Sequence, residues 1–133
     1  SMGAADFLLG VCESWMTPAL FLSVTFIAGA VISFFTGSSW GTFAICIPIA
    51  VPMAYSFTGG QLGTLVYAAV GAVVSGGLFG DHCSPVSDTS VLSSLGAACD
   101  HIDHVRTQLP YALLAAAVSI ILWIVVALVG GAA

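Results

Sequence analysis

Charge is the scarcest property of this chain. Its 133 residues include one Lys or Arg and six Asp or Glu, so that charged residues make up 5% of the sequence. A soluble domain carries about 25% charged residues. With 59% hydrophobic residues and a mean hydropathy of +1.14, the composition predicts an integral membrane protein. The near absence of basic side chains also argues against nucleic acid as a partner, because contacts to phosphate need Lys or Arg.

The chain also lacks the patterns of a disulfide scaffold and of an enzyme. Its cysteines stand at positions 12, 46, 83 and 99, with irregular spacing, whereas disulfide frameworks belong to small secreted chains. No nucleophile–base arrangement, phosphate-binding loop or dinucleotide fingerprint stands out in the sequence. We therefore expect neither an enzymatic activity nor a bound cofactor.

Three apolar stretches are long enough to span a bilayer, at residues 18–35, 60–79 and 111–129. At 1.5 Å per residue, each reaches about 27–30 Å as a helix. Residues 43–55 are apolar but shorter and contain Pro48 and Pro52, which disfavour a straight helix. This segment is predicted to be a half-helix or a re-entrant element.

The remaining segments are short or polar. Residues 1–16 mix acids with apolar side chains and are expected to form an interfacial or partial helix; residues 91–98 are a short apolar segment, and residues 100–108 are a polar connector. The predicted fold is therefore all-α and membrane-embedded, with about three full transmembrane helices and two broken or re-entrant half-helices. Residues 1–133 form a single transmembrane domain that resembles one repeat-like half of a transporter.

Small residues recur at every fourth position along the second span. The row comprises Gly60, Thr64, Ala68, Ala72, Gly76 and Gly80. Rows of this kind let two helix backbones approach closely in a membrane. We favour this packing role over direct contact with a substrate.

Residues 80–90 concentrate polar groups between two apolar segments. They include Asp81 and Asp88, and a charge at membrane depth costs roughly 2.5–3.5 kcal/mol. A carboxylate buried in apolar surroundings can hold a proton near neutral pH, and hard cations such as Na⁺ prefer oxygen ligands. The acids, with the hydroxyls of Ser84, Ser87 and Thr89, are therefore candidates to bind Na⁺ and H⁺ in alternation. The alternative is that Asp88 and Ser84 only cap a helix and a turn, because Asp and Ser are favoured capping residues.

Residues 36–42 form a second polar break, with hydroxyls at Ser38, Ser39 and Thr42. Each break follows a long apolar span and precedes a shorter one, as in transporters whose discontinuous helices meet near the bilayer midplane. The backbone groups freed by a break need polar partners in lipid, so two facing breaks would make a polar site. The alternative for this segment is a polar loop with Trp40 anchored at the membrane interface.

A third polar cluster follows at residues 99–104. Its residue types suit zinc, but no pair of ligands with finger-like spacing repeats at a distance. A polar turn at the membrane surface is the favoured interpretation. A further alternative is a proton-entry route, because histidine titrates near pH 6.5. This candidate proton pathway comprises His82, Asp100, His101, Asp103 and His104.

These segments resemble the signatures of the NhaC-type sodium/proton antiporter family, in its C-terminal portion. The resemblance lies in residues 36–44 (TGSSWGTFA), 80–94 (GDHCSPVSDTSVLSS) and 99–113 (CDHIDHVRTQLPYAL). It implies a membrane fold of two inverted repeats. The acids at 81 and 88 would bind Na⁺ or H⁺, the hydroxyls at 84, 87 and 89 would line that site, and those at 38, 39 and 42 would face it.

The resemblance also bears on assembly, because family members are several times longer than this chain. The chain is then either a portion of a longer transporter or a half-size protein completed by a second copy as a homo-oligomer. Its lone basic residue gives almost no positive-inside bias, which permits insertion in both orientations.

The leading hypothesis is a secondary transporter, or its core half, that exchanges Na⁺ for H⁺ in a prokaryotic cytoplasmic membrane. Its expected partners are these two ions and the lipid bilayer. One alternative is a proton- or Na⁺-coupled exchanger of small organic anions, since N–H groups at helix N-termini can bind carboxylates. The other alternative is a membrane subunit that transports nothing.

Overall fold

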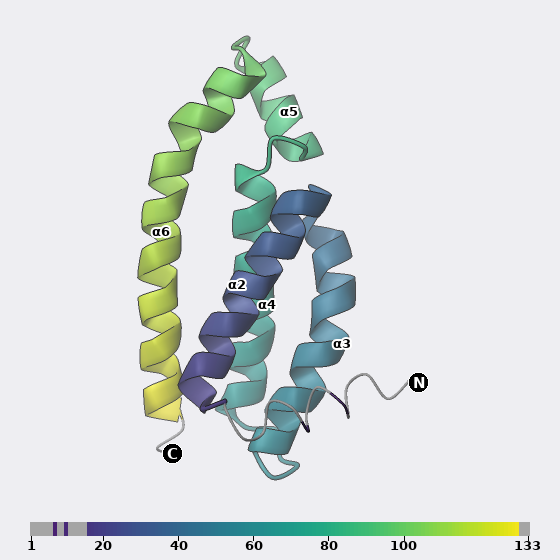
Figure 1. The fold of residues 1–133 in the computed structure, drawn as a ribbon, viewed down its shortest axis with the longest axis vertical. Coiled ribbons are helices and arrows are strands. Elements are labelled where there is room, and N and C mark those ends of the chain that lie inside the picture. The colour runs from purple at the N-terminus through teal and green to yellow at the C-terminus, as the bar shows by residue number, and fades with distance from the viewer. Residues whose placement is uncertain (1–6, 8–9, 11–15, 131–133) are drawn as a thin grey trace.

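The chain folds as a bundle of α-helices, as a computed structural model shows (Figure 1). The structure describes Phe7, Gly10 and residues 16–130; the helix expected over residues 1–16 lies almost wholly outside them. The helices are α2 (Pro18–Thr36), α3 (Ser39–Phe57), α4 (Thr64–Cys83), α5 (Asp88–Gly96) and α6 (His101–Gly130). All except α5 are long and apolar enough to cross a membrane. The predicted all-α membrane fold is therefore confirmed.

The chain runs up and down the bundle, so that both breaks lie toward the same end (Figure 1). Helices α2 and α4 point in one direction, and α3 and α6 return in the other. The break between α2 and α3 is only Gly37 and Ser38, and the break between α4 and α5 covers residues 84–87. Both breaks fall within the segments predicted from the sequence, but they are narrower.

Helices α2 and α4 pack most closely in the bundle, and glycines at the contact allow their backbones to approach. A Cβ atom on Gly76 would collide with the carbonyl oxygen of Phe26, and one on Gly80 with that of Ala30. From the other side, a Cβ on Gly29 would lie 3.3 Å from the Val73 carbonyl oxygen. The packing role predicted for the row of small residues is thus confirmed for its last two members.

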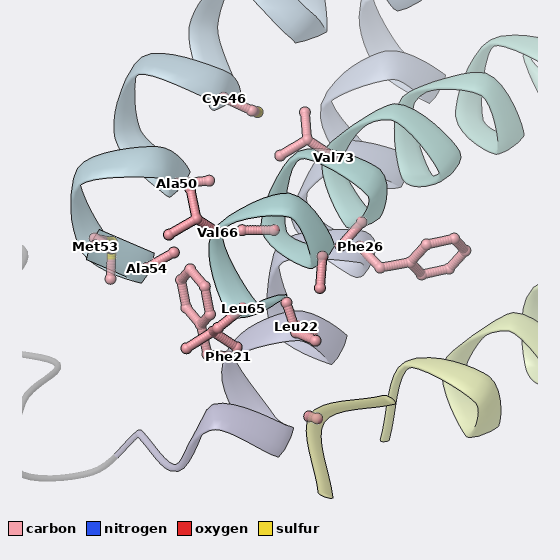
Figure 2. Packing of buried hydrophobic residues seen from close by; sticks show 14 of the residues in the cluster. Phe21, Leu22, Phe26, Cys46, Ala50, Met53, Ala54, Leu65, Val66 and Val73 are labelled. Carbon is pink, nitrogen blue, oxygen red and sulfur yellow. The ribbon is translucent and has the colours of Figure 1, made fainter. Parts of the chain in front are cut away.

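The apolar core lies on both sides of α4, against α2 and α3 and, to a lesser extent, α6 (Figure 2). Its largest fully buried side chains are Phe21 and Leu22 of α2 and Val73 of α4. The cluster of buried residues also includes Phe26, Cys46, Ala50, Met53, Ala54, Leu65, Val66, Ala68, Ala69, Ala72, Ala116 and Ala127. Many are alanines, which fits helices held together by close backbone approach more than by large side chains.

Helix α3 corrects one prediction from the sequence. Residues 43–55 are not a half-helix or a re-entrant element, but part of a continuous helix of 19 residues. The helix gains a first turn from the polar break, because Ser38 caps it with a side-chain oxygen that accepts from the Gly41 N–H at 3.3 Å. Pro48 and Pro52 lie four residues apart and are both exposed, so the backbone bonds that they remove lie along one face.

Helix α6 corrects a second prediction, that residues 100–108 form a connector. The helix begins at His101 because the Asp100 carboxylate accepts from the N–H groups of Ile102 and Asp103, at 2.9 and 3.2 Å. A side-chain cap can start a helix without an apolar run, so the polar residues become its first turns. The predicted span at 111–129 is the remainder of α6, which is about 45 Å long in all.

The α2–α4 contact can be tested by adding one methyl group. We expect Gly80→Ala to destabilise the protein by about 1–3 kcal/mol, the usual cost of overpacking a close contact. Gly96→Ala is the matched control, because a Cβ there meets no atom within 4 Å and alanine favours helix. Thermal unfolding in detergent micelles measures both. Equal melting temperatures for the two variants would contradict the proposed contact.

Candidate functional site

The two breaks pack directly against each other. Gly37 has a φ of +66°, and a Cβ added to it would lie 2.9 Å from the carbonyl carbon of Val86. The Ser84 hydroxyl donates to the Phe34 carbonyl at 2.6 Å and accepts from the Val86 N–H at 3.1 Å. The last turn of α2 therefore holds the break after α4 in place. This arrangement brings the N-termini of α3 and α5 to the end of α4.

Asp81 lies at the centre of this meeting point, in the last turn of α4. Its side chain is only 8% exposed. One carboxylate oxygen accepts from the Ser87 hydroxyl at 2.6 Å, and the other accepts from the Ser39 hydroxyl at 3.1 Å. A buried carboxylate needs such donors, because burying an unpaired charge costs several kcal/mol. Ser39 directly follows the first break, and Ser87 is the last residue of the second.

Both donors stand at helix N-termini, which carry partial positive charge. Ser39 is the first residue of α3, and Ser87 is the N-cap of α5. The Ser87 side chain makes no capping bond to the α5 backbone. Its oxygen lies 2.7 Å from Thr89 Oγ1 instead, while its proton is directed at Asp81. Two helix ends thus stabilise one carboxylate.

The other predicted site hydroxyls support this cluster from a distance. Ser38 caps α3, and the fully buried Thr42 donates to the Ser38 carbonyl at 2.9 Å, which fixes the first turn of α3 under Ser39. Thr89 reaches Asp81 only through Ser87. A direct role of these residues in ion binding stays a prediction.

The two predicted acids differ in their surroundings. Asp88 begins α5 and is exposed, whereas Asp81 is buried in the hydroxyl cluster. Within the described part of the chain, Asp88 does not line the cavity beside Asp81. The pairing of the two aspartates in one site therefore stays a prediction.

A cavity of about 630 Å³ opens beside Asp81, mainly between α4 and α6. His82, Thr89 and Gln108 line it, and the same three side chains line a neighbouring cavity of about 220 Å³ together with His104. Gln108 donates to the His82 carbonyl at 2.8 Å, and its own carbonyl oxygen is buried with no hydrogen-bond partner among the described residues. Sequence analysis missed Gln108, although its position four residues after His104 places both on one face of a helix.

The members of the candidate proton pathway separate in the structure. His82 and His104 line these cavities. His101 instead bridges two segments: its Nε2 donates to the Pro85 carbonyl at 2.8 Å, and its Nδ1 lies 3.2 Å from the Ser94 hydroxyl. Asp100 caps α6, and Asp103 is exposed on the first turn of that helix. These three residues have structural or surface positions, and a role in proton movement stays a prediction for all five.

The donor set suits a hard monovalent cation better than a transition metal. Among residues 16–130, no group of three or more His, Cys, Asp or Glu side chains is placed to hold a metal ion. The cluster at Asp81 offers one carboxylate and several hydroxyl oxygens. Such oxygen ligands are those that hard cations prefer, and they are few enough to allow release.

Comparison with known proteins finds similarity to antiporters. The model of the Na⁺/H⁺ antiporter family matches residues 2–128. An uncharacterised protein of Haemophilus influenzae is 52% identical over 82% of the chain and 20% of its own length. The malate-2H⁺/Na⁺-lactate antiporter of Bacillus subtilis is 36% identical over 86% of the chain, and the Na⁺/H⁺ antiporter NhaC of Alkalihalophilus pseudofirmus is 32% identical over 93%.

The chain spans about a fifth to a quarter of the length of these relatives, at 20%, 23% and 26%. No solved structure was found to match it.

The contact between the breaks generates a prediction for Gly37. We expect Gly37→Ala to lower the free energy of unfolding by about 1–2 kcal/mol, because alanine disfavours the left-handed backbone at this position. The collision of its Cβ with Val86 should lower it further. Gly59→Ala is the matched control, because Gly59 has a φ of +64° and a Cβ there meets no atom within 4 Å. In detergent, the melting temperature of Gly37→Ala should be well below that of Gly59→Ala.

A thiol label distinguishes local opening from global loss of stability. Cys83 is buried beside the break, and Cys46 is buried in α3. In a protein with Cys12 and Cys99 replaced by serine, Gly37→Ala should speed maleimide labelling of Cys83 more than that of Cys46. Equal labelling rates at Cys83 in the parent and the variant would show that Gly37 does not hold the breaks together.

Proposed function

Because this chain belongs to the Na⁺/H⁺ antiporter family, we propose that it forms the ion-binding core of a secondary transporter that exchanges Na⁺ for H⁺ at Asp81. Its family and four long apolar helices make it an integral membrane protein, and its bacterial relatives place it in the cytoplasmic membrane. The observation that carries the proposal is the buried carboxylate of Asp81, held by hydroxyls from two helix breaks.

Exchange follows from competition for one carboxylate. A proton on Asp81 removes the negative charge that a cation needs, and a bound Na⁺ disfavours the proton by like-charge repulsion. When Na⁺ binds, Ser39 and Ser87 rotate their hydroxyl protons away and present lone pairs as oxygen ligands beside the carboxylate. Because each occupant excludes the other, movement of the site across the membrane couples the two fluxes.

The helix N-termini set the strength of this site. Their partial positive charges stabilise the ionised carboxylate, but they also oppose a cation beside it. One full negative charge therefore attracts the cation, and two partial positive charges weaken its binding. A transport site requires such a balance, because an ion that binds too tightly cannot leave.

Asp88 enters the proposal as a second acid at the start of α5. Its carboxylate is exposed in the described chain, so coordination by Asp88 requires groups outside residues 16–130. The length of the relatives leaves room for such groups. Transport by the whole protein, including any second copy or further repeat, is part of the same proposal.

The proposal is tested by removing the charge at Asp81. Asp81→Asn keeps the shape and the hydrogen-bonding capacity of the side chain but cannot exchange a proton for Na⁺. In proteoliposomes with an imposed pH gradient, we expect Na⁺/H⁺ exchange to fall by at least 100-fold. Tyr67→Phe on the exposed face of α4 is the control and should exchange at the parent rate. Parent-like exchange by Asp81→Asn would overturn the proposal, and parent-like exchange by Asp88→Asn would remove Asp88 from it.

A second candidate function is coupled exchange of a small organic anion. It is favoured by the cavity of about 630 Å³ beside Asp81, which exceeds the needs of a bare ion, and by the similarity to a malate/lactate exchanger. Liposomes preloaded with malate or lactate distinguish the two. Accelerated uptake of labelled malate or lactate under these conditions would favour organic-anion exchange, and exchange of Na⁺ and H⁺ alone would exclude it.

A further inference from the structure

We infer that Ser87 and Thr89 form a relay that carries protons between the smaller cavity, which His104 lines, and Asp81, so that Thr89 is a positioning residue for protons rather than an ion ligand. The inference rests on the function proposed above and deepens it, because it gives the proton a route of its own. Three observations support it: the direction of the hydrogen bonds, the position of Thr89 in the cavities, and the side chains that surround it.

The hydrogen bonds have one consistent direction when Asp81 is ionised. A carboxylate can only accept, so the single proton of the Ser87 hydroxyl points to Asp81 across 2.6 Å. Ser87 therefore cannot donate to Thr89, although the two oxygens lie 2.7 Å apart. Thr89 must donate to Ser87. The chain of donors runs from Thr89 through Ser87 to the carboxylate.

A proton can pass along this chain without any side chain leaving its place. A hydronium ion or an imidazolium in the cavity gives a proton to Thr89 Oγ1, which passes its own hydroxyl proton to Ser87 Oγ. Ser87 passes its original proton to the Asp81 carboxylate, which becomes a neutral carboxylic acid. Both hydroxyls are restored, and all three donors now point outward. The reverse sequence returns the proton to the cavity along the same bonds, and the hydroxyls must rotate only before a second proton can enter.

Thr89 is the member of the chain that meets the smaller cavity, whereas the larger cavity is lined by Thr89 and by Asp81 itself. Thr89 is exposed and lines both of them, whereas Ser87 is fully buried. His82 and Gln108 line the same two cavities, and His104 lines the smaller one. Among the described residues, the titratable side chains that line these cavities are Asp81, His82, His104 and Tyr111, and Asp88 lies between the two relay residues in the sequence. The cavities can bring water and a proton donor to Thr89.

A cation can reach the carboxylate without the relay, because Asp81 itself lines the larger cavity. Ser39 and Ser87 contact its two oxygens directly, but Thr89 stands one hydroxyl further away. Loss of the Thr89 hydroxyl should therefore impair proton transfer more than Na⁺ binding. A ligand of the ion would impair both to the same degree.

The test compares Thr89→Val, which keeps the shape without the hydroxyl, with Thr89→Ser, which keeps the hydroxyl. Two modes are measured in proteoliposomes that contain the full protein: Na⁺/H⁺ exchange, and exchange of labelled for unlabelled Na⁺ without a pH gradient. We expect Thr89→Val to slow Na⁺/H⁺ exchange at least 10-fold more than Na⁺/Na⁺ exchange, and Thr89→Ser to restore the parent ratio.

The outcomes separate this inference from the proposed function. Equal slowing of both modes by Thr89→Val, or slowing of neither, would overturn the relay. The relay would also be overturned if Thr89→Ser failed to restore the parent ratio, because the change in side-chain shape, and not the loss of the hydroxyl, would then explain the effect. Loss of both modes in Asp81→Asn, measured in parallel, would uphold the ion site whichever way the Thr89 variants behave.

Discussion

The carboxylate of Asp81, buried at the end of α4 and paired on each oxygen with a serine hydroxyl, is the constraint on which the rest of the site depends. A charge in a membrane protein persists only where the fold compensates it. Here the compensation comes from the first residue of α3 and the N-cap of α5. Two helices must therefore begin within hydrogen-bond reach of one side chain, and the chain must break twice to bring them there.

The contact between α2 and α4 makes that convergence possible. Gly76 and Gly80 let the backbones approach until a single methyl group would collide with a carbonyl oxygen of α2. The same approach brings Phe34 within reach of Ser84 and Gly37 against Val86, so the end of α2 holds the break after α4. The small residues along α4 thus help to build the cluster around Asp81, although none of them contacts its carboxylate.

The described helices supply both hydroxyls that donate to the Asp81 carboxylate. The hydroxyls and the carboxylate come from α3, α4 and α5, and the adjoining cavities are completed by α6. What lies open is Asp88 and one side of the cavities. The chain matches about a fifth to a quarter of the length of its relatives, so the remainder of such a protein could cover these surfaces.

The sequence alone determined the class of the protein, the apolar spans at 18–35 and 111–129, and the positions of both breaks, because these depend on composition and on local capping and breaking residues. It misjudged residues 43–55 and 100–108, since a helix can pass through proline on an exposed face or start at a capping aspartate without an apolar run. It singled out Asp81 by the cost of its charge but could not choose its partners. Asp81 and its partner Ser39 are 42 positions apart in the sequence. The hydrogen bond from Gln108 to the His82 carbonyl depends on where α6 lies against α4. Only the tertiary structure decided these contacts, because they follow from how closely α2 and α4 pack and not from any local preference of the chain.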